Sequence, residues 1–145
     1  MKKAASTKNA TVVFWLVLAG AAWLLAMWLA GRAPVSQNAT ITPMLAMALS
    51  DDESKELSII TVEYPPGGST PAHAHHAQAL LYILEGSIVM QVRGGAAVTL
   101  SSGQTWYKGP EDVLDVSRNA SKSAPAKYVI FMVKEKSAPI LTPIM

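Results

Sequence analysis

The sequence predicts an all-β domain preceded by one transmembrane helix, and three observations support this. Between Met44 and Leu141, short apolar and β-branched runs alternate with turn residues at close intervals, as in a sandwich or barrel. Thr11–Ala30 carries neither charge nor proline. The motifs Gly-x-Gly-x-x-Gly, Gly-x-x-x-x-Gly-Lys-Ser/Thr and Gly-x-Ser-x-Gly do not occur, which argues against a nucleotide-binding or hydrolase fold of the α/β class.

The apolar segment Thr11–Ala30 is long enough to cross a bilayer. As a helix, twenty residues at 1.5 Å each span about 30 Å, the thickness of the hydrocarbon core. Lys2, Lys3 and Lys8 precede the segment, whereas only Arg32 follows it closely. The positive-inside rule then leaves residues 1–10 in the cytoplasm, residues 11–31 in the membrane and the rest outside the cytoplasm, in the periplasm. The predicted partner of this segment is the lipid bilayer.

A cleaved signal peptide is the alternative interpretation, and it predicts a secreted protein. Gly31 and Ala33 provide the small residues that a signal peptidase requires. The apolar run is, however, longer than the usual 7–15 residues of a signal peptide, which favours an uncleaved anchor. Residues 32–43, polar and containing Pro34, are expected to form a linker.

Composition excludes several kinds of site. The chain has no cysteine, so disulfides, thiolate metal sites and cysteine nucleophiles are ruled out. The formal net charge of the whole chain is +2. From Ala33 onward, however, eight Lys and Arg residues stand against ten Asp and Glu residues, a net charge of −2. No basic stripe with interleaved aromatics is present, so nucleic acid is not an expected partner.

Turn signals divide residues 44–141 into short strands, with residues 142–145 as a tail. Gly94-Gly95 predicts a two-residue hairpin turn with Gln91–Arg93 and Val98–Leu100 as its arms. Several large side chains are expected to fill the core, namely Tyr82, Trp106, Tyr107, Met44, Met47, Met90 and Met132. The predicted strands are Met44–Leu49, Leu57–Tyr64, Leu80–Leu84, Ile88–Val92, Ala97–Leu100, Thr105–Tyr107, Val113–Arg118 and Lys127–Val133.

All three histidines lie within four positions, at His73, His75 and His76. In a strand, successive side chains alternate faces, so His73 and His75 point the same way and His76 points the other way. The Cα atoms of His73 and His75 are then about 6.6 Å apart, which lets the two imidazoles converge on one metal ion. The alternative is a pair of histidines that are only packed or solvated.

The sequence around these histidines resembles the cupin superfamily, single-domain members in particular. The first motif is Gly67-x5-His73-Ala-His75, which continues to Glu85-Gly86. Parts of the second motif follow at Ser101–Tyr107, Gly109-Pro110 and Ser117–Ser121. The resemblance covers about Met44 to Leu141 and implies a cupin jelly-roll barrel. It also implies one divalent metal ion (iron, manganese, zinc or nickel) at the barrel mouth and pairing into homodimers.

The chain departs from the family pattern at two ligand positions. The usual glutamate, four or five residues after the second histidine, is replaced by Ala79 or Leu80, and Gln78 is one residue early. Gln78 could supply an amide oxygen if a bulge turned it inward. The last histidine of the second motif is also missing. Leu114 occupies its place if the motif is aligned from Ser117–Asn119, and Asp115 if it is counted from Pro110; the former alignment is favoured.

The resemblance therefore predicts a metal site made of His73, His75 and Gln78, weaker than the usual set. Two classes of function fit it. The first is a small-molecule enzyme, of dioxygenase or isomerase type, that depends on the metal. The second is a non-catalytic barrel that binds a small molecule as an accessory or sensor domain, with or without metal. The sequence leaves undecided whether the protein is an enzyme.

Overall fold

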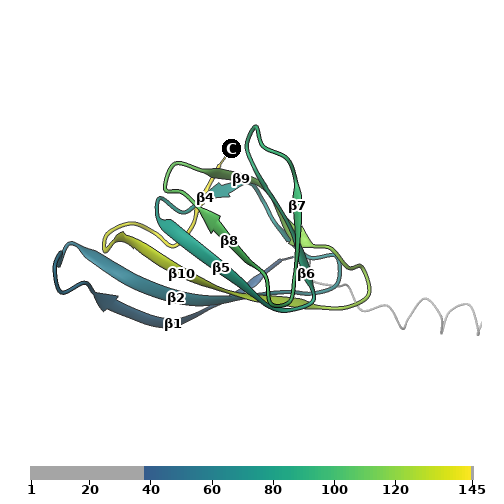
Figure 1. Ribbon diagram of the computed structural model, residues 1–145, viewed down its shortest axis with the longest axis horizontal. Coiled ribbons are helices and arrows are strands. Elements are labelled where there is room, and N and C mark those ends of the chain that lie inside the picture. Colours follow the sequence, from purple (N-terminus) through teal and green to yellow (C-terminus); the bar gives the residue numbers. More distant parts are fainter. Residues whose placement is uncertain (1–37, 145) are drawn as a thin grey trace, which may run out of the picture. The chain divides into compact units, whose positions relative to one another are not determined.

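Antiparallel strands make up the regular structure of residues 38–144, the part of the chain that the computed structural model describes. The predicted transmembrane segment Thr11–Ala30 lies outside these residues. Within residues 38–144 no helix is long and apolar enough to cross a membrane. The strands, labelled in Figure 1, are β1 (Thr40–Ala48), β2 (Lys55–Tyr64), β3 (Ser69–Thr70), β4 (His73–Ala74), β5 (Gln78–Glu85), β6 (Ser87–Val92), β7 (Val98–Ser101), β8 (Thr105–Lys108), β9 (Val113–Asn119), β10 (Ala126–Glu135) and β11 (Thr142–Pro143).

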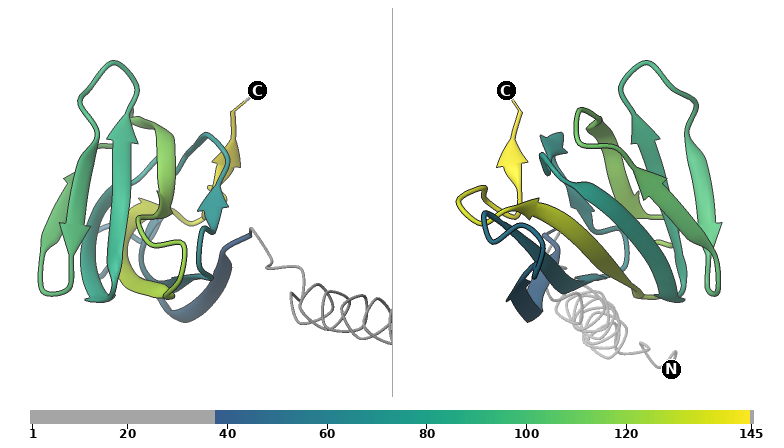
Figure 2. Two further views of the ribbon diagram at one scale, coloured as in Figure 1. Left: turned by 90° about the vertical axis from the view of Figure 1, so that its right-hand side faces the viewer. Right: turned by 60° about the vertical axis from the view of Figure 1, so that its left-hand side comes forward.

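The strands form two sheets that face each other, the arrangement of a jelly roll (Figures 1 and 2). The five-stranded sheet has the order β1-β2-β10-β5-β8. The six-stranded sheet has the order β11-β4-β9-β6-β7, with β3 also paired to β9. Non-consecutive neighbours such as β2 and β10 bring distant parts of the sequence together, and β4 with its histidine is placed beside β9 in this way.

The core lies between the two sheets and follows a period of two along each strand. In β5, Ala79, Leu81 and Ile83 are buried while the residues between them are exposed. Tyr64 spans the interior, and its hydroxyl lies 2.8 Å from Ser117 Oγ and 2.6 Å from Thr70 Oγ1. The buried cluster comprises Ile60, Val62, Tyr64, Ala77, Ala79, Leu81, Ile83, Ile88, Met90, Leu100, Leu114, Ala126, Tyr128, Ile130 and Met132.

Several sequence predictions of strand bounds need correction. β1 begins at Thr40, and it contains Pro43 because it is an edge strand with a register shift between Pro43 and Leu45. Two-residue strands such as β4 and β11 were not predicted, since two residues show no periodicity. The Gly94-Gly95 turn is present, with Gly95 N donating to Val92 O over 2.9 Å. It does not close a two-residue hairpin, because pairing between β6 and β7 starts only at Met90 and Val98 and leaves residues 91–97 in the connection.

The predicted core is right for some large side chains and wrong for others. Met90 and Met132 are buried, and Trp106 packs against the core. Tyr82 and Tyr107 are exposed on the outer face of the five-stranded sheet instead. Met44 and Met47 are also exposed, because β1 is an edge strand without a covering layer. Residue type alone predicts that such side chains are buried, whereas the face on which each one lies depends on strand register.

Candidate ligand-binding site around His73 and His75

The structure places His73 and His75 side by side inside the domain. Their ring centroids are 4.9 Å apart and their planes meet at 89°. The exposed fractions are only 3% for His73 and 4% for His75. His73 belongs to β4, while His75 follows the strand and is succeeded by His76, which has a positive φ of 47° and is exposed. The structure therefore brings the first two histidines together and leaves the third exposed, whereas their convergence on a metal ion stays a prediction.

Each of the two rings is held through its Nδ1 atom. Nδ1 of His73 lies 2.8 Å from Pro71 O, and Nδ1 of His75 lies 2.6 Å from Ile140 O. Because a carbonyl oxygen can only accept, each Nδ1 carries the proton and the other nitrogen, Nε2, has a free lone pair. Within residues 38–144 neither Nε2 forms a hydrogen bond. Every fully buried side-chain nitrogen in this part of the chain does have a partner, so the two Nε2 atoms are not fully buried and retain some access to solvent.

Burial keeps both imidazoles neutral at physiological pH. It lowers the pKa of His73 and lowers the pKa of His75 to about 4, and in each case the hydrogen bond to the carbonyl opposes this effect. The positive charge of Lys108 also lowers the pKa of both rings. A neutral imidazole with its Nδ1–H bound to a carbonyl can accept a hydrogen bond or coordinate a metal through Nε2.

Gln78, the third predicted ligand, does not join the histidines. It begins β5 in regular register, paired with Val133, and its neighbour Ala79 pairs with Met132. Ala79 is buried and Gln78 is exposed, so the pleat directs Gln78 to the outer face. The bulge that would have turned its amide inward is not present.

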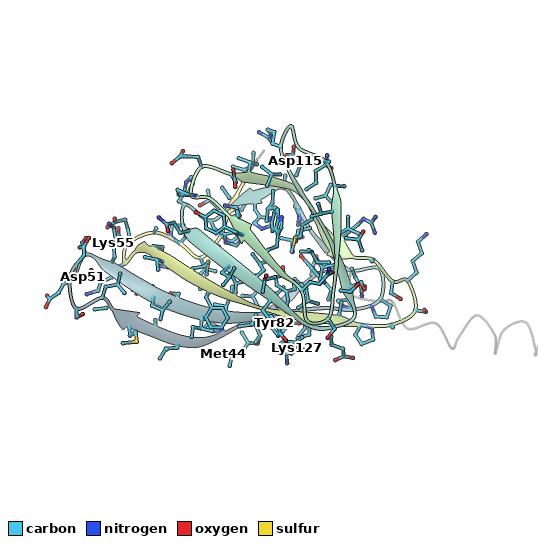
Figure 3. The ribbon with its side chains drawn as sticks, viewed as in Figure 1. Met44, Asp51, Lys55, Tyr82, Asp115 and Lys127 are labelled. Atoms are coloured by element: carbon cyan, nitrogen blue, oxygen red, sulfur yellow. The ribbon has the colours of Figure 1, made fainter. Side chains whose placement is uncertain are left out.

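The positions of the two missing family ligands are now defined. Leu114 pairs directly with His73 and is buried, which favours the alignment that gives it the place of the absent histidine; the assignment itself stays a prediction. Asp115 faces outward and pairs with Arg93, whose Nη2 lies 2.9 Å from Asp115 Oδ1 (Asp115 is labelled in Figure 3). Ala79, at one of the two positions expected for the glutamate, is buried but contributes no ligand atom.

A buried lysine lies across from Ala79. Lys108, the last residue of β8, pairs with Ala79 and is 0% exposed, so its side chain points into the barrel. Its Nζ donates to Gly109 O over 3.0 Å. Burial lowers the pKa of Lys108, and the nearby carboxylates of Asp112 and Glu111 raise it in part. Lys108 is not among the predicted site residues, although alternation with Trp106 places both side chains on the inner face.

These residues do not fit a resident divalent metal ion. A tight site needs three or four donor atoms, at least one of them usually a carboxylate in sites of the iron-oxygenase type. Here only the two neutral imidazoles of His73 and His75 remain. The other two ligand positions hold Leu114 and Ala79, and the ammonium group of Lys108 points inward. Within residues 38–144 no group of three or more His, Asp or Glu side chains is arranged to hold a metal. The buried charge of Lys108 would also repel a second cation.

Solved structures of other proteins share this fold. A conserved protein with a double-stranded beta-helix domain from Klebsiella pneumoniae is 17% identical, with 76% of this chain and 87% of that chain covered and a TM-score of 0.58. An oxalate oxidase in complex with the substrate analogue glycolate is 16% identical, with 79% and 59% covered and a TM-score of 0.57. The DMSP lyase DddQ from Ruegeria pomeroyi is 14% identical with a TM-score of 0.55; the match covers 72% of this chain and about half (51%) of the lyase. At these identities the likeness concerns the fold.

A comparison with family profiles is more specific. No curated protein matches the chain significantly. The profile described as "Cupin domain" matches residues 60–133, just over half of the chain, and this range includes the histidine pair, Lys108 and Leu114. The chain therefore belongs to the cupin family.

Proposed function

We propose that this protein is a membrane-anchored, extracytoplasmic cupin barrel that binds a small carboxylate in its interior without a resident metal ion. The observation that carries the proposal is that Leu114 and Ala79 stand at two positions where the family pattern has metal ligands. The ammonium group of Lys108 lies opposite Ala79. The positive charge of Lys108, which Asp112 and Glu111 offset in part, favours an anion beside the histidines.

The three nitrogen-bearing side chains define the class of ligand. Lys108 uses one donor on Gly109 O, which leaves two donors for a ligand oxygen. The Nε2 atom of either His73 or His75 can accept the one hydrogen bond that a hydroxyl group of the same ligand donates. A hydroxycarboxylate such as glycolate combines both groups, and glycolate is the analogue bound by the oxalate oxidase of similar fold.

Calorimetry on the full chain in detergent micelles tests this function, with glycolate and oxalate as probes. We expect saturable binding by the wild type and at least tenfold weaker binding by Lys108→Met, which keeps the length of the side chain. Lys122→Met, which removes an exposed lysine, is the matched control and should bind as the wild type does. Circular dichroism establishes that each variant is folded.

Metal analysis of the same preparations separates this proposal from the metal-dependent enzyme. If the wild-type chain retains one transition-metal ion per molecule and loses it in His73→Ala, the metal-free proposal is wrong. Absence of any binding of either carboxylate would contradict the ligand class.

The anchor and the location are tested by labelling. The chain has no cysteine, so Thr99→Cys, on an exposed position of β7, introduces a single thiol. A membrane-impermeant maleimide should label this thiol in intact cells, because the barrel is proposed to lie outside the cytoplasm. Labelling only after lysis would reverse the proposed topology, and loss of the chain from the membrane fraction would favour the secreted form.

A further inference from the structure

A cavity lies at the end of β5 that is farther from the histidines. Its volume is about 340 Å³, within the range of about 300–1,000 Å³ that is usual for small-molecule sites. β5 begins at Gln78, two residues after His76, and ends at Glu85, which lines the cavity. Its eight residues at about 3.4 Å each place roughly 24 Å between the two ends. The cavity is therefore separate from the site around His73 and His75.

A β-bulge turns Glu85 toward this cavity. Between Ile83 and Glu85 the register of β5 with β10 shifts by one residue, so that Leu84 is an extra residue in β5. Ile83 is buried in the core, and regular alternation would direct Glu85 to the same inner side. The extra residue moves Glu85 to the outer side of the sheet, directly opposite Lys127. Figure 3 shows Lys127 on this outer side, away from Asp115 of the six-stranded sheet.

The charges that line the cavity are unbalanced. Glu63, Glu85 and Lys127 all belong to the lining, so two carboxylates stand against one ammonium group, a formal charge of −1. Lys127 Nζ lies 2.6 Å from Glu63 Oε1, and these two side chains form an ion pair. Within residues 38–144 Glu85 takes part in no ion pair. A cavity with a net negative charge and an unpaired carboxylate in its wall favours a cation.

A buried asparagine holds the loops that form two walls of the cavity. Asn119 is 2% exposed, and its Nδ2 donates to Pro65 O over 3.1 Å and to Ala124 O over 2.8 Å. Pro65 and Pro125 line the cavity, and the ring of each proline fixes its φ angle. Because one buried amide ties both loops, the walls are in place before a ligand binds, which reduces the ordering cost of binding.

The lining defines the ligand as a primary amine with an apolar body. An ammonium group has three donors. Glu85, the second carboxylate oxygen of Glu63 and the hydroxyl group of Thr40 are acceptors in the same lining. The rings of Pro65 and Pro125 provide an apolar surface beside these acceptors, against which a hydrocarbon body packs.

We propose that this cavity is a second ligand site, which binds a small primary amine with an apolar body through the carboxylate of Glu85. Lys127 opposes this binding, because its ammonium group occupies Glu63 and repels another cation. The site depends neither on the carboxylate ligand proposed above nor on a metal ion. Lys108→Met, which should weaken the binding of glycolate, should therefore leave the binding of the amine unchanged.

Phenethylamine and 2-phenylethanol are probes of similar size and shape, and only the amine is charged. Nuclear magnetic resonance titration of the isotope-labelled full chain in detergent micelles measures their binding. With phenethylamine, the backbone amide signals of Glu63, Glu85 and Ala126 should shift and saturate, and those of His73 and His75 should not. We expect 2-phenylethanol to bind about tenfold more weakly or worse, because it lacks the charge-assisted hydrogen bond to Glu85. Equal binding of the two probes, or shifts centred on the histidines, would overturn the proposal.

Substitutions of the charged side chains test the role of each. Glu85→Gln keeps the shape of the side chain and should weaken phenethylamine binding by about tenfold or more. Glu53→Gln, which removes an exposed glutamate from the turn between β1 and β2, is the matched control and should bind as the wild type does. Binding by a folded Glu85→Gln variant that equals that of the wild type would show that the site is wrongly assigned.

Lys127→Met should strengthen binding, an outcome that damage to the fold would not produce. Loss of the lysine frees Glu63 and removes the repulsion of the ligand, so we expect about fivefold tighter binding of phenethylamine. Circular dichroism establishes that the variant is folded. Weaker binding by folded Lys127→Met would mean that the lysine itself holds the ligand, and the proposed cationic class would be wrong.

Discussion

Leu114 lies directly opposite His73 where β9 pairs with β4, and both side chains are buried. In the family pattern a third imidazole would occupy this place. A leucine there leaves the histidine pair without its third donor, and Lys108 adds a positive charge from the neighbouring sheet. The leucine and the buried lysine each disfavour a metal ion. The strand pairing that would position the ligands of a metal ion is nevertheless retained.

The first prediction is that Leu114→His restores metal binding. Residues opposite each other in a sheet share a face, so the new imidazole would lie beside His73. Changes in the outer partners of metal ligands alter affinity by about 10- to 100-fold, and a new direct ligand should raise the affinity for Zn²⁺ by at least as much. Calorimetric titration of the wild type and the variant with Zn²⁺ measures the change. Asp115→His, which points outward, is the control and should show no gain.

Stability should fall as the solution is acidified, because of His75. Burial lowers its pKa from 6.5 to about 4 in the folded state, so between these values the unfolded chain binds more protons. The free energy of unfolding is therefore highest above pH 6.5 and falls as pH drops toward 4, by about 3 kcal/mol in all. Urea unfolding across this pH range measures the slope. His75→Asn should reduce the slope but leave part of it, because burial also lowers the pKa of His73, and His76→Asn, an exposed neighbour, should leave the slope unchanged. Equal slopes in all three chains would contradict this assignment.

Gly86 and Gly94 should respond differently to alanine although both have positive φ, 71° and 78°. A Cβ at Gly86 would lie 2.7 Å from Pro125 O and 2.9 Å from Ala126 Cβ, whereas Gly94 has open space around it. Gly94→Ala should lower the free energy of unfolding by about 1 kcal/mol through backbone strain alone. Gly86→Ala adds the steric clash and should cost about 3 kcal/mol. Chemical denaturation of the two variants compares them directly, and similar losses would show that the clash is relieved.

Lys134 should matter more for stability than Lys127. Lys134 is 5% exposed, and its Nζ lies 2.8 Å from Glu56 Oε1 and 2.7 Å from Ala138 O. Lys134→Met removes the ion-pair partner of the Glu56 carboxylate and leaves it only the hydrogen bond from Ser58 Oγ, and we expect a loss of about 2 kcal/mol in the free energy of unfolding. Lys127 pairs with Glu63 on the surface, so Lys127→Met should cost less than about 1 kcal/mol. Thermal unfolding of both variants provides the comparison.

Local rules were sufficient for much of the fold. Alternation of apolar residues located most strands of four residues or more. It does not explain the placement of all three histidines, because β4 ends at Ala74, Ala74 is buried as the histidines beside it are, and His76 has a positive φ of 47°. The same alternation, read through Trp106, would have revealed Lys108 as an inward-facing lysine. The role of His73 and His75 as ligands of a metal ion or of a small molecule stays a prediction.

The sequence by itself determined the strand pattern, the family and the clustering of the histidines, because these depend on residues close together along the chain. Only the tertiary structure decided that Gln78 faces outward, that Leu114 rather than Asp115 faces His73, and that Lys108 lies across from Ala79. It also decided that Tyr82, Tyr107 and Met47 lie outside the core. The physical reason is that the face on which a side chain lies changes with each residue of register, and register between strands distant in sequence is set by pairing across the whole sheet.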